Sequence, residues 1–131
     1  MNPANRLNIE WDWRYVGPIV LQGDRLVFPK VSEAPGVYRF RLNGSVYIGE
    51  STNLRRRFNG YRNPGPTQQT NQRMNPVIAA AVSAGAAELE VVGTATVNGV
   101  EYDPSLGPAR LLVENAALIA AAGDGEKVLN R

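Results

Sequence analysis

The dipeptide Asn43-Gly44 is the strongest local constraint on how this chain folds. It separates two short segments rich in β-branched and aromatic residues. Asn and Gly both tolerate positive φ, so an Asn-Gly pair in this setting favours a two-residue β-hairpin turn. We therefore expect strands over residues 37–42 and 45–49, joined by this turn.

A two-residue turn also fixes which residues of the two strands face each other. Phe40 is expected opposite Tyr47, and Tyr38 opposite Gly49. Tyr38 and Tyr47 then lie on the same face of the hairpin as diagonal neighbours, with backbones about 7–8 Å apart. The hairpin is therefore predicted to bring two phenol rings together.

A helix is expected directly after the hairpin, with Ser51 or Thr52 as its N-cap. Apolar residues at i, i+4 and i+7 predict its buried stripe: Leu54, Phe58 and Tyr61. Arg57 falls on the edge of this stripe that faces the sheet, whereas Arg55 and Arg56 point outward. One arginine of the three is thus predicted to be directed inward.

The remaining segments indicate an α+β chain with an N-terminal extension. The alternation of residues 8–15 favours a strand on which Trp11 and Trp13 share a face, and residues 25–28 favour a short second one. A helix is expected over residues 76–84, with Asn75 as N-cap and Pro76 at its first position. Residues 88–97 favour another strand, residues 98–108 a loop, and residues 108–122 a helix that ends at Gly123.

The last of these helices carries a carboxylate in an apolar setting. Leu111, Glu114 and Leu118 share one face of it. An ionised carboxylate among apolar side chains is costly unless it is paired or bound to a metal. Glu114 is therefore a candidate ligand or ion-pair partner.

Positive charge is concentrated in one part of the chain. Residues 39–73 contain seven arginines and a single acid, Glu50, although the net charge of the whole chain is only +2. A localised arginine patch favours a nucleic-acid partner, and the alternative is a solvated arginine face. Glu50 either points away from such a partner or weakens binding locally.

Composition excludes several kinds of site. The 131 residues, enough for one domain, include no Cys and no His. Disulfides, Cys-type zinc sites and His-containing triads are therefore excluded. The first residues lack the basic start and apolar run of a signal peptide, and no apolar run is long enough to span a membrane, so we expect a cytoplasmic protein.

Two tripeptides and their spacing carry a resemblance to a known family. "GVY" at residues 36–38 is followed nine residues later by "YIG" at residues 47–49. This pattern resembles the signature of the GIY-YIG endonucleases, with Val37 in place of isoleucine. Arg57 stands ten residues after the second tyrosine, where the family has an essential arginine. The other matching positions are Tyr61, Glu114 with Leu118-Ile119, and Leu129-Asn130.

The resemblance implies a fold and a domain division. Residues 34–131 would form a nuclease domain with a small three-stranded antiparallel sheet flanked by helices. Residues 1–33 would be an extension that packs on that domain.

The resemblance also implies a metal-dependent DNA endonuclease that hydrolyses phosphodiester bonds. Glu114 would hold one Mg²⁺ or Mn²⁺, and Arg57 would bind the scissile phosphate. The two tyrosines of the hairpin, Arg57 and Glu114 are expected to surround one common pocket. Tyr38 is expected as general base with Tyr47 as its hydrogen-bonding partner, although the two roles are exchangeable. Tyr61 and Asn130 would complete the site, and secondary contacts with the nucleic-acid backbone would come from Arg55, Arg56, Arg62 and Arg73.

Other interpretations of the same residues stay open. The fold could serve a nucleic-acid-binding module without catalysis, and RNA or branched or damaged DNA could be the partner. Arg57 and Glu114 could form a structural ion pair, and the tyrosines could be ordinary core aromatics. Asn130 could belong to a frayed terminus. Target, biological role and oligomeric state do not follow from the sequence.

Overall fold

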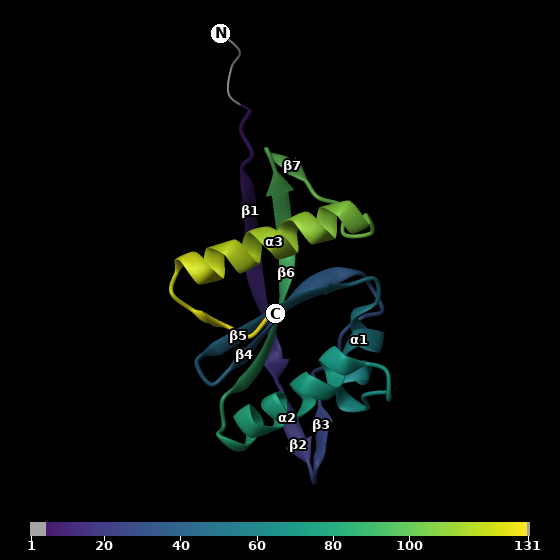
Figure 1. Ribbon diagram of the computed structural model, residues 1–131. Helices are drawn as coiled ribbons and strands as arrows, with labels where there is room; N and C mark the ends of the chain where they lie inside the picture. The colour runs from purple at the N-terminus through teal and green to yellow at the C-terminus, as the bar shows by residue number, and fades with distance from the viewer. Residues whose placement is uncertain (1–4, 131) are drawn as a thin grey trace.

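One six-stranded sheet with helices on both faces organises residues 5–130, which are the residues described by the computed structural model (Figure 1). The architecture is α+β, as the sequence predicts. The elements of this described part are β1 (Ile9–Pro18), β2 (Val20–Gln22), β3 (Arg25–Val27), β4 (Gly36–Leu42), β5 (Ser45–Ser51), α1 (Leu54–Arg62), α2 (Gln69–Ser83), β6 (Ala87–Val97), β7 (Val100–Glu101), α3 (Gly107–Gly123) and β8 (Lys127–Val128). Residues 1–4 of the expected extension and residue 131 lie outside it.

The prediction of a three-stranded sheet is wrong in strand number. The three expected strands form its centre, in the order β6-β4-β5, but the full order is β1-β6-β4-β5-β8, with β7 paired to β6. β1 pairs with β6 along most of its length, from Ile9 opposite Val97 to Pro18 opposite Glu88. The N-terminal segment therefore contributes an edge strand to the sheet, and β2 and β3 form a separate hairpin.

The hairpin β4–β5 has the predicted register. Asn43 and Gly44 adopt φ values of 52° and 85°, as the turn requires. Phe40 is paired with Tyr47, and Tyr38 with Gly49. Because the side chains of a strand alternate between faces, this register places both tyrosines on the same side of the sheet.

The helices cover opposite faces of the sheet. On one face α1 and α2 bury a cluster that contains Tyr38, Phe40 and Tyr47. On the other face α3 packs on a second cluster that contains Val37 and Ile48, and Trp11 and Trp13 pack against it. In Figure 1 α3 crosses β1 and β6, whereas α1 and α2 lie together beside the β2–β3 hairpin. The tyrosines therefore face α1 and α2.

The structure corrects the predicted start of both helices α1 and α2. The N-cap of α1 is Asn53, whose side chain accepts from the Arg56 N–H, in place of Ser51 or Thr52. α2 begins at Gln69 and contains Pro76 in its interior. A buried stripe continues through the proline and holds both halves of α2 on the core: Asn71, Met74, Ile78 and Ala81.

Among the residues that the structure describes, no helix is both long enough and apolar enough to cross a membrane. The segment expected as a loop after β6 also contains the short strand β7, which follows a second Asn-Gly turn at Asn98-Gly99.

Replacing Gly49 tests how tightly the hairpin packs. A Cβ on Gly49 would overlap the hydroxyl and Cζ of Tyr38, a ring that is fully buried and fixed by hydrogen bonds. We expect Gly49→Ala to lower the free energy of unfolding by about 1–3 kcal/mol, the usual cost of overpacking. The measurement is urea denaturation.

Gly123→Ala is the matched control, because a Cβ at Gly123 meets no atom within 4 Å. Because Gly123 ends α3 without a positive φ, this change should leave the free energy of unfolding unchanged or raise it by up to about 1 kcal/mol. Equal stability of the Gly49→Ala variant and the parent would show that Tyr38 does not need this space.

Candidate active site

Arg57 is held between two tyrosine hydroxyls. Its Nε donates to the Tyr38 hydroxyl at 3.2 Å, and its Nη2 donates to the Tyr61 hydroxyl at 3.0 Å. The two hydroxyls also share a hydrogen bond of 2.7 Å. The inward orientation predicted for Arg57 is thus confirmed, and Tyr61 belongs to the same cluster.

The two phenols of this cluster are neutral. Burial raises the pKa of Tyr38 to about 12, against the lowering effect of Arg57. Burial also raises the pKa of Tyr61, and the neighbouring Tyr38 and Tyr47 raise it further. A general base needs a pKa near the working pH, so the direction found for Tyr38 is opposite to the one its expected role requires.

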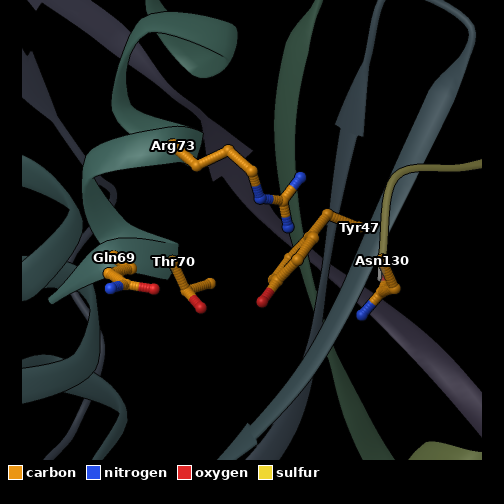
Figure 2. A pocket seen from close by; sticks show the side chains of 5 residues that line it. All are labelled: Tyr47, Gln69, Thr70, Arg73 and Asn130. Carbon is orange, nitrogen blue, oxygen red and sulfur yellow. The ribbon is translucent and has the colours of Figure 1, made fainter.

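Tyr47 differs from Tyr38 because it reaches an open pocket. The pocket has a volume of about 470 Å³ and lies between α2, β5 and the C-terminal segment. Its lining residues are Tyr47, Gln69, Thr70, Arg73 and Asn130. Figure 2 shows Arg73 extending from α2 toward the Tyr47 ring, with Asn130 on the far side of that ring.

Asn130 is fixed to the outer edge of β5. Its Oδ1 accepts from the Ile48 N–H at 3.0 Å, and its Nδ2 donates to the Ile48 carbonyl at 2.6 Å. The side-chain amide therefore continues the pairing that β8 makes with Ser45 and Val46. The alternative of a frayed end does not apply to Asn130, which is held in place beside Tyr47.

A second pocket lies beside the first and is lined by Arg57. It has a volume of about 350 Å³ and shares Gln69 and Thr70 with the pocket of Tyr47. No residue lining either of these two pockets is acidic, and each contains one arginine. We refer to these two neighbouring polar pockets at the start of α2, one with Arg57 and the other with Arg73, as the groove. Sequence reasoning missed Gln69 and Thr70 because it placed the start of α2 at Pro76.

Glu114 lies on the helix that covers the opposite face of the sheet. The buried residues of α3 are Arg110, Val113, Ala117 and Ala121. Leu111 is about half exposed and Glu114 is partly buried at the border, so the predicted apolar face was wrong by one position. Glu114 lines neither pocket of the groove, and the expected enclosure of all the groups in one pocket is not found.

Charged groups outside α3 nevertheless act on Glu114. Burial raises the pKa of Glu114 and the Glu50 carboxylate raises it further, whereas the Glu50 backbone amide and Arg57 lower it. Within residues 5–130 no strand pairs with the outer edge of β5 beyond Ile48. The charges of Glu50 and Arg57 therefore both act on Glu114, although α3 covers the face of the sheet opposite to α1.

Glu50 is neutralised by a buried partner. The Nε of Arg110 donates to the Glu50 carboxylate at 2.7 Å, and Arg110 Nη1 donates to the Pro104 carbonyl at 2.8 Å. Arg110 is buried, which is unusual for a charged residue unless it is paired. Sequence reasoning missed this pair, although a lone arginine among the apolar residues of α3 was a signal for it.

The arginine patch is smaller than its sequence count indicates. Arg39 makes two hydrogen bonds to Glu90, and Arg41 forms ion pairs with Glu90 and Glu126. These two arginines are therefore neutralised within the sheet.

The other predicted backbone contacts lie at three different places. Arg73 lines the groove, and Arg56 is exposed on α1. Arg55 and Arg62 line a cavity on the opposite side of α1. The structure thus brings only Arg73 to Tyr47 and Asn130.

Glu114 is the residue to which the resemblance assigns a divalent cation. The Glu114 carboxylate is partly buried beside a second carboxylate, and it forms no ion pair within the described residues. The described part of the chain contains no group of three or more His, Cys, Asp or Glu that could hold a metal. Glu114 would therefore be the single protein ligand that the resemblance implies.

Comparisons with protein-family models, with curated proteins and with solved structures returned no significant match.

The neutral state of Tyr38 predicts a specific loss of stability at high pH. A tyrosine in the unfolded chain has a pKa of about 10, so between pH 10 and about 12 the unfolded chain loses this proton first. The free energy of unfolding should therefore be unaffected below pH 10 and fall above it, by at most about 3 kcal/mol from Tyr38. Urea denaturation at pH 8 and pH 11 measures the change.

Tyr38→Phe should remove part of this pH dependence, because phenylalanine has no proton to lose. Tyr15→Phe is the control, since Tyr15 is exposed. An unchanged pH dependence in Tyr38→Phe would mean that the Tyr38 hydroxyl is not held neutral by the fold.

Proposed function

We propose that this chain is a GIY-YIG-type endonuclease that hydrolyses phosphodiester bonds in DNA with the help of one divalent cation. On this proposal the strands β6, β4 and β5 are the three-stranded sheet of that fold, and β1 and β8 are additions to it. The observation that carries the proposal is the acid-free groove between Arg57 and Arg73, with Tyr47 and Asn130 beside it.

The groove suits a phosphodiester backbone. A guanidinium has five N–H donors, and Arg57 gives one to each of two tyrosines, so three remain for a ligand. Arginine binds phosphate oxygens with paired, charge-assisted hydrogen bonds. The absence of acids from the lining of the groove favours an anion there, and Arg57 would stabilise the charge that develops on the phosphoryl oxygens.

Tyr47 is the better candidate for the general base. Its ring lies in the pocket, whereas Tyr38 is fully buried with a pKa of about 12. Tyr38 and Tyr61 would act as positioning residues that aim Arg57 into the groove. We therefore assign the role of general base to Tyr47 in place of Tyr38.

Glu114 would hold Mg²⁺ or Mn²⁺ through a carboxylate oxygen, the ligand type that these cations prefer. When bound, such a cation supplies Lewis-acid polarisation of the phosphoryl group. Arg110 keeps Glu50 engaged, which leaves Glu114 as the carboxylate available to a cation at the end of β5.

Nicking of supercoiled plasmid DNA with Mg²⁺ or Mn²⁺, and its loss in chelator, is the direct assay. Arg57→Ala should lower the rate about 10²–10³-fold, as loss of a transition-state donor does. Glu114→Gln should lower it at least as much, because the neutral amide binds a cation weakly. Arg6→Ala and Glu101→Gln are the matched controls, since both residues are exposed and neither is assigned a contact with DNA.

Full activity of Arg57→Ala and Glu114→Gln would contradict the proposal. A parent protein that binds DNA with a steep dependence on salt, but gives no product with either metal, would instead be the non-catalytic binding module.

A pair of hydroxyl deletions tests the exchange of roles. Tyr47→Phe keeps the ring and removes the candidate base, so the rate should fall about 10²–10⁴-fold. Tyr38→Phe removes one of the two hydrogen bonds that position Arg57, and its effect should be smaller. Single-turnover rates measure both. A larger loss in Tyr38→Phe than in Tyr47→Phe would return the role of base to Tyr38.

A further inference from the structure

A cavity of about 380 Å³ lies between α1 and the segment that follows β3. Arg62 borders it, and at about 100° per residue Arg62 is roughly 140° around the helix from Arg57. The cavity is therefore separate from the groove of the proposed active site. Three of its lining residues are cations, namely Lys30, Arg55 and Arg62, and none is acidic.

Arg62 has a hydrogen-bond donor that the protein does not use. Its Nε is buried and has no partner among the described residues. A buried donor on a charged group is costly when it is left unpaired, and the two Nη groups of Arg62 also make no hydrogen bond within the described residues, so this guanidinium is available to an anionic acceptor at the cavity. Lys30 adds positive charge at the same cavity, whereas Arg55 is engaged by the Glu33 carboxylate and the Val31 carbonyl. Arg62 and Lys30 therefore point to an anion as part of the ligand.

The remainder of the cavity is apolar and aromatic. Phe28 and Phe58 line it, and their rings are stacked with centroids 5.4 Å apart and planes 16° apart. Phe58 is buried, whereas Phe28 is partly exposed. An aromatic wall beside cationic side chains is the combination that binds a nucleobase together with its phosphate.

We propose that this cavity binds one nucleotide unit, with the base against Phe28 and the phosphate on Arg62 and Lys30. The unit is either a free nucleoside monophosphate or an unpaired nucleotide of a nucleic-acid strand. In the second case the inference rests on the proposed function, because the strand would be the one bound in the groove.

Calorimetric titration with AMP, in chelator, tests the site without any cutting. Arg62→Met keeps the aliphatic stem and should weaken AMP binding about tenfold. Lys30→Gln should weaken it up to about fivefold, as an exposed charge does. Arg6→Met and Lys127→Gln change exposed residues outside the cavity and should have no effect. Inorganic phosphate and adenosine should each bind more weakly than AMP.

A second titration identifies the source of the nucleotide. A DNA duplex with one unpaired adenine should bind more tightly than the fully paired duplex if the unit belongs to a strand, and Arg62→Met should remove the difference. AMP binding without such a difference would identify the free nucleotide.

The proposal is overturned if neither AMP nor the unpaired adenine binds in a way that depends on Arg62 and Lys30. It is also overturned if inorganic phosphate binds as tightly as AMP, because the base would then contribute nothing. Neither result bears on plasmid nicking, so failure of this site and failure of the nuclease proposal are separable.

Discussion

The placement of Arg57 between Tyr38 and Tyr61 is the interaction on which the candidate site depends. A partly buried guanidinium is costly unless its N–H groups are paired, and two phenol oxygens provide that pairing. Both phenols stay neutral, so they accept from Arg57 without cancelling its charge. Gly49 belongs to the same unit, because the Tyr38 ring occupies the space above it. Tyr38, Tyr61 and Gly49 thus hold the positively charged guanidinium of Arg57 at the groove.

The outer edge of β5 is only partly paired, and the proposed groups lie on both faces of the sheet. β8 and the Asn130 amide pair with the first half of this edge, and the second half is unpaired in the described residues. Tyr47 lies on the face that α1 and α2 cover, whereas Glu114 lies on α3, which covers the other face. Because the sheet separates the two faces, Glu114 does not line the pockets that contain Arg57 and Tyr47.

The features that could be predicted from the sequence are those that depend on residues close together in the chain. The hairpin register followed from the Asn43-Gly44 turn, and the inward side of Arg57 followed from helical spacing, because both depend on residues close in sequence. β1 and β8 extend the sheet through pairings with distant segments, such as Ile9 with Val97, which spacing cannot indicate. The start of α2 was missed because Pro76 resembles a first helical residue.

The ion pair between Glu50 and Arg110 is the other feature that the sequence did not predict. It also bears on the role proposed for Glu114. The sequence places Glu50 in an arginine-rich region, yet its partner is Arg110, sixty residues away on α3. Arg110 takes a buried position on that helix and so turns Glu114 to the border of the apolar face. Two carboxylates then lie near each other, and only Glu50 has an ion-pair partner in the described residues. A carboxylate in that situation favours either a proton or a cation, and a cation is the choice that phosphodiester hydrolysis would use.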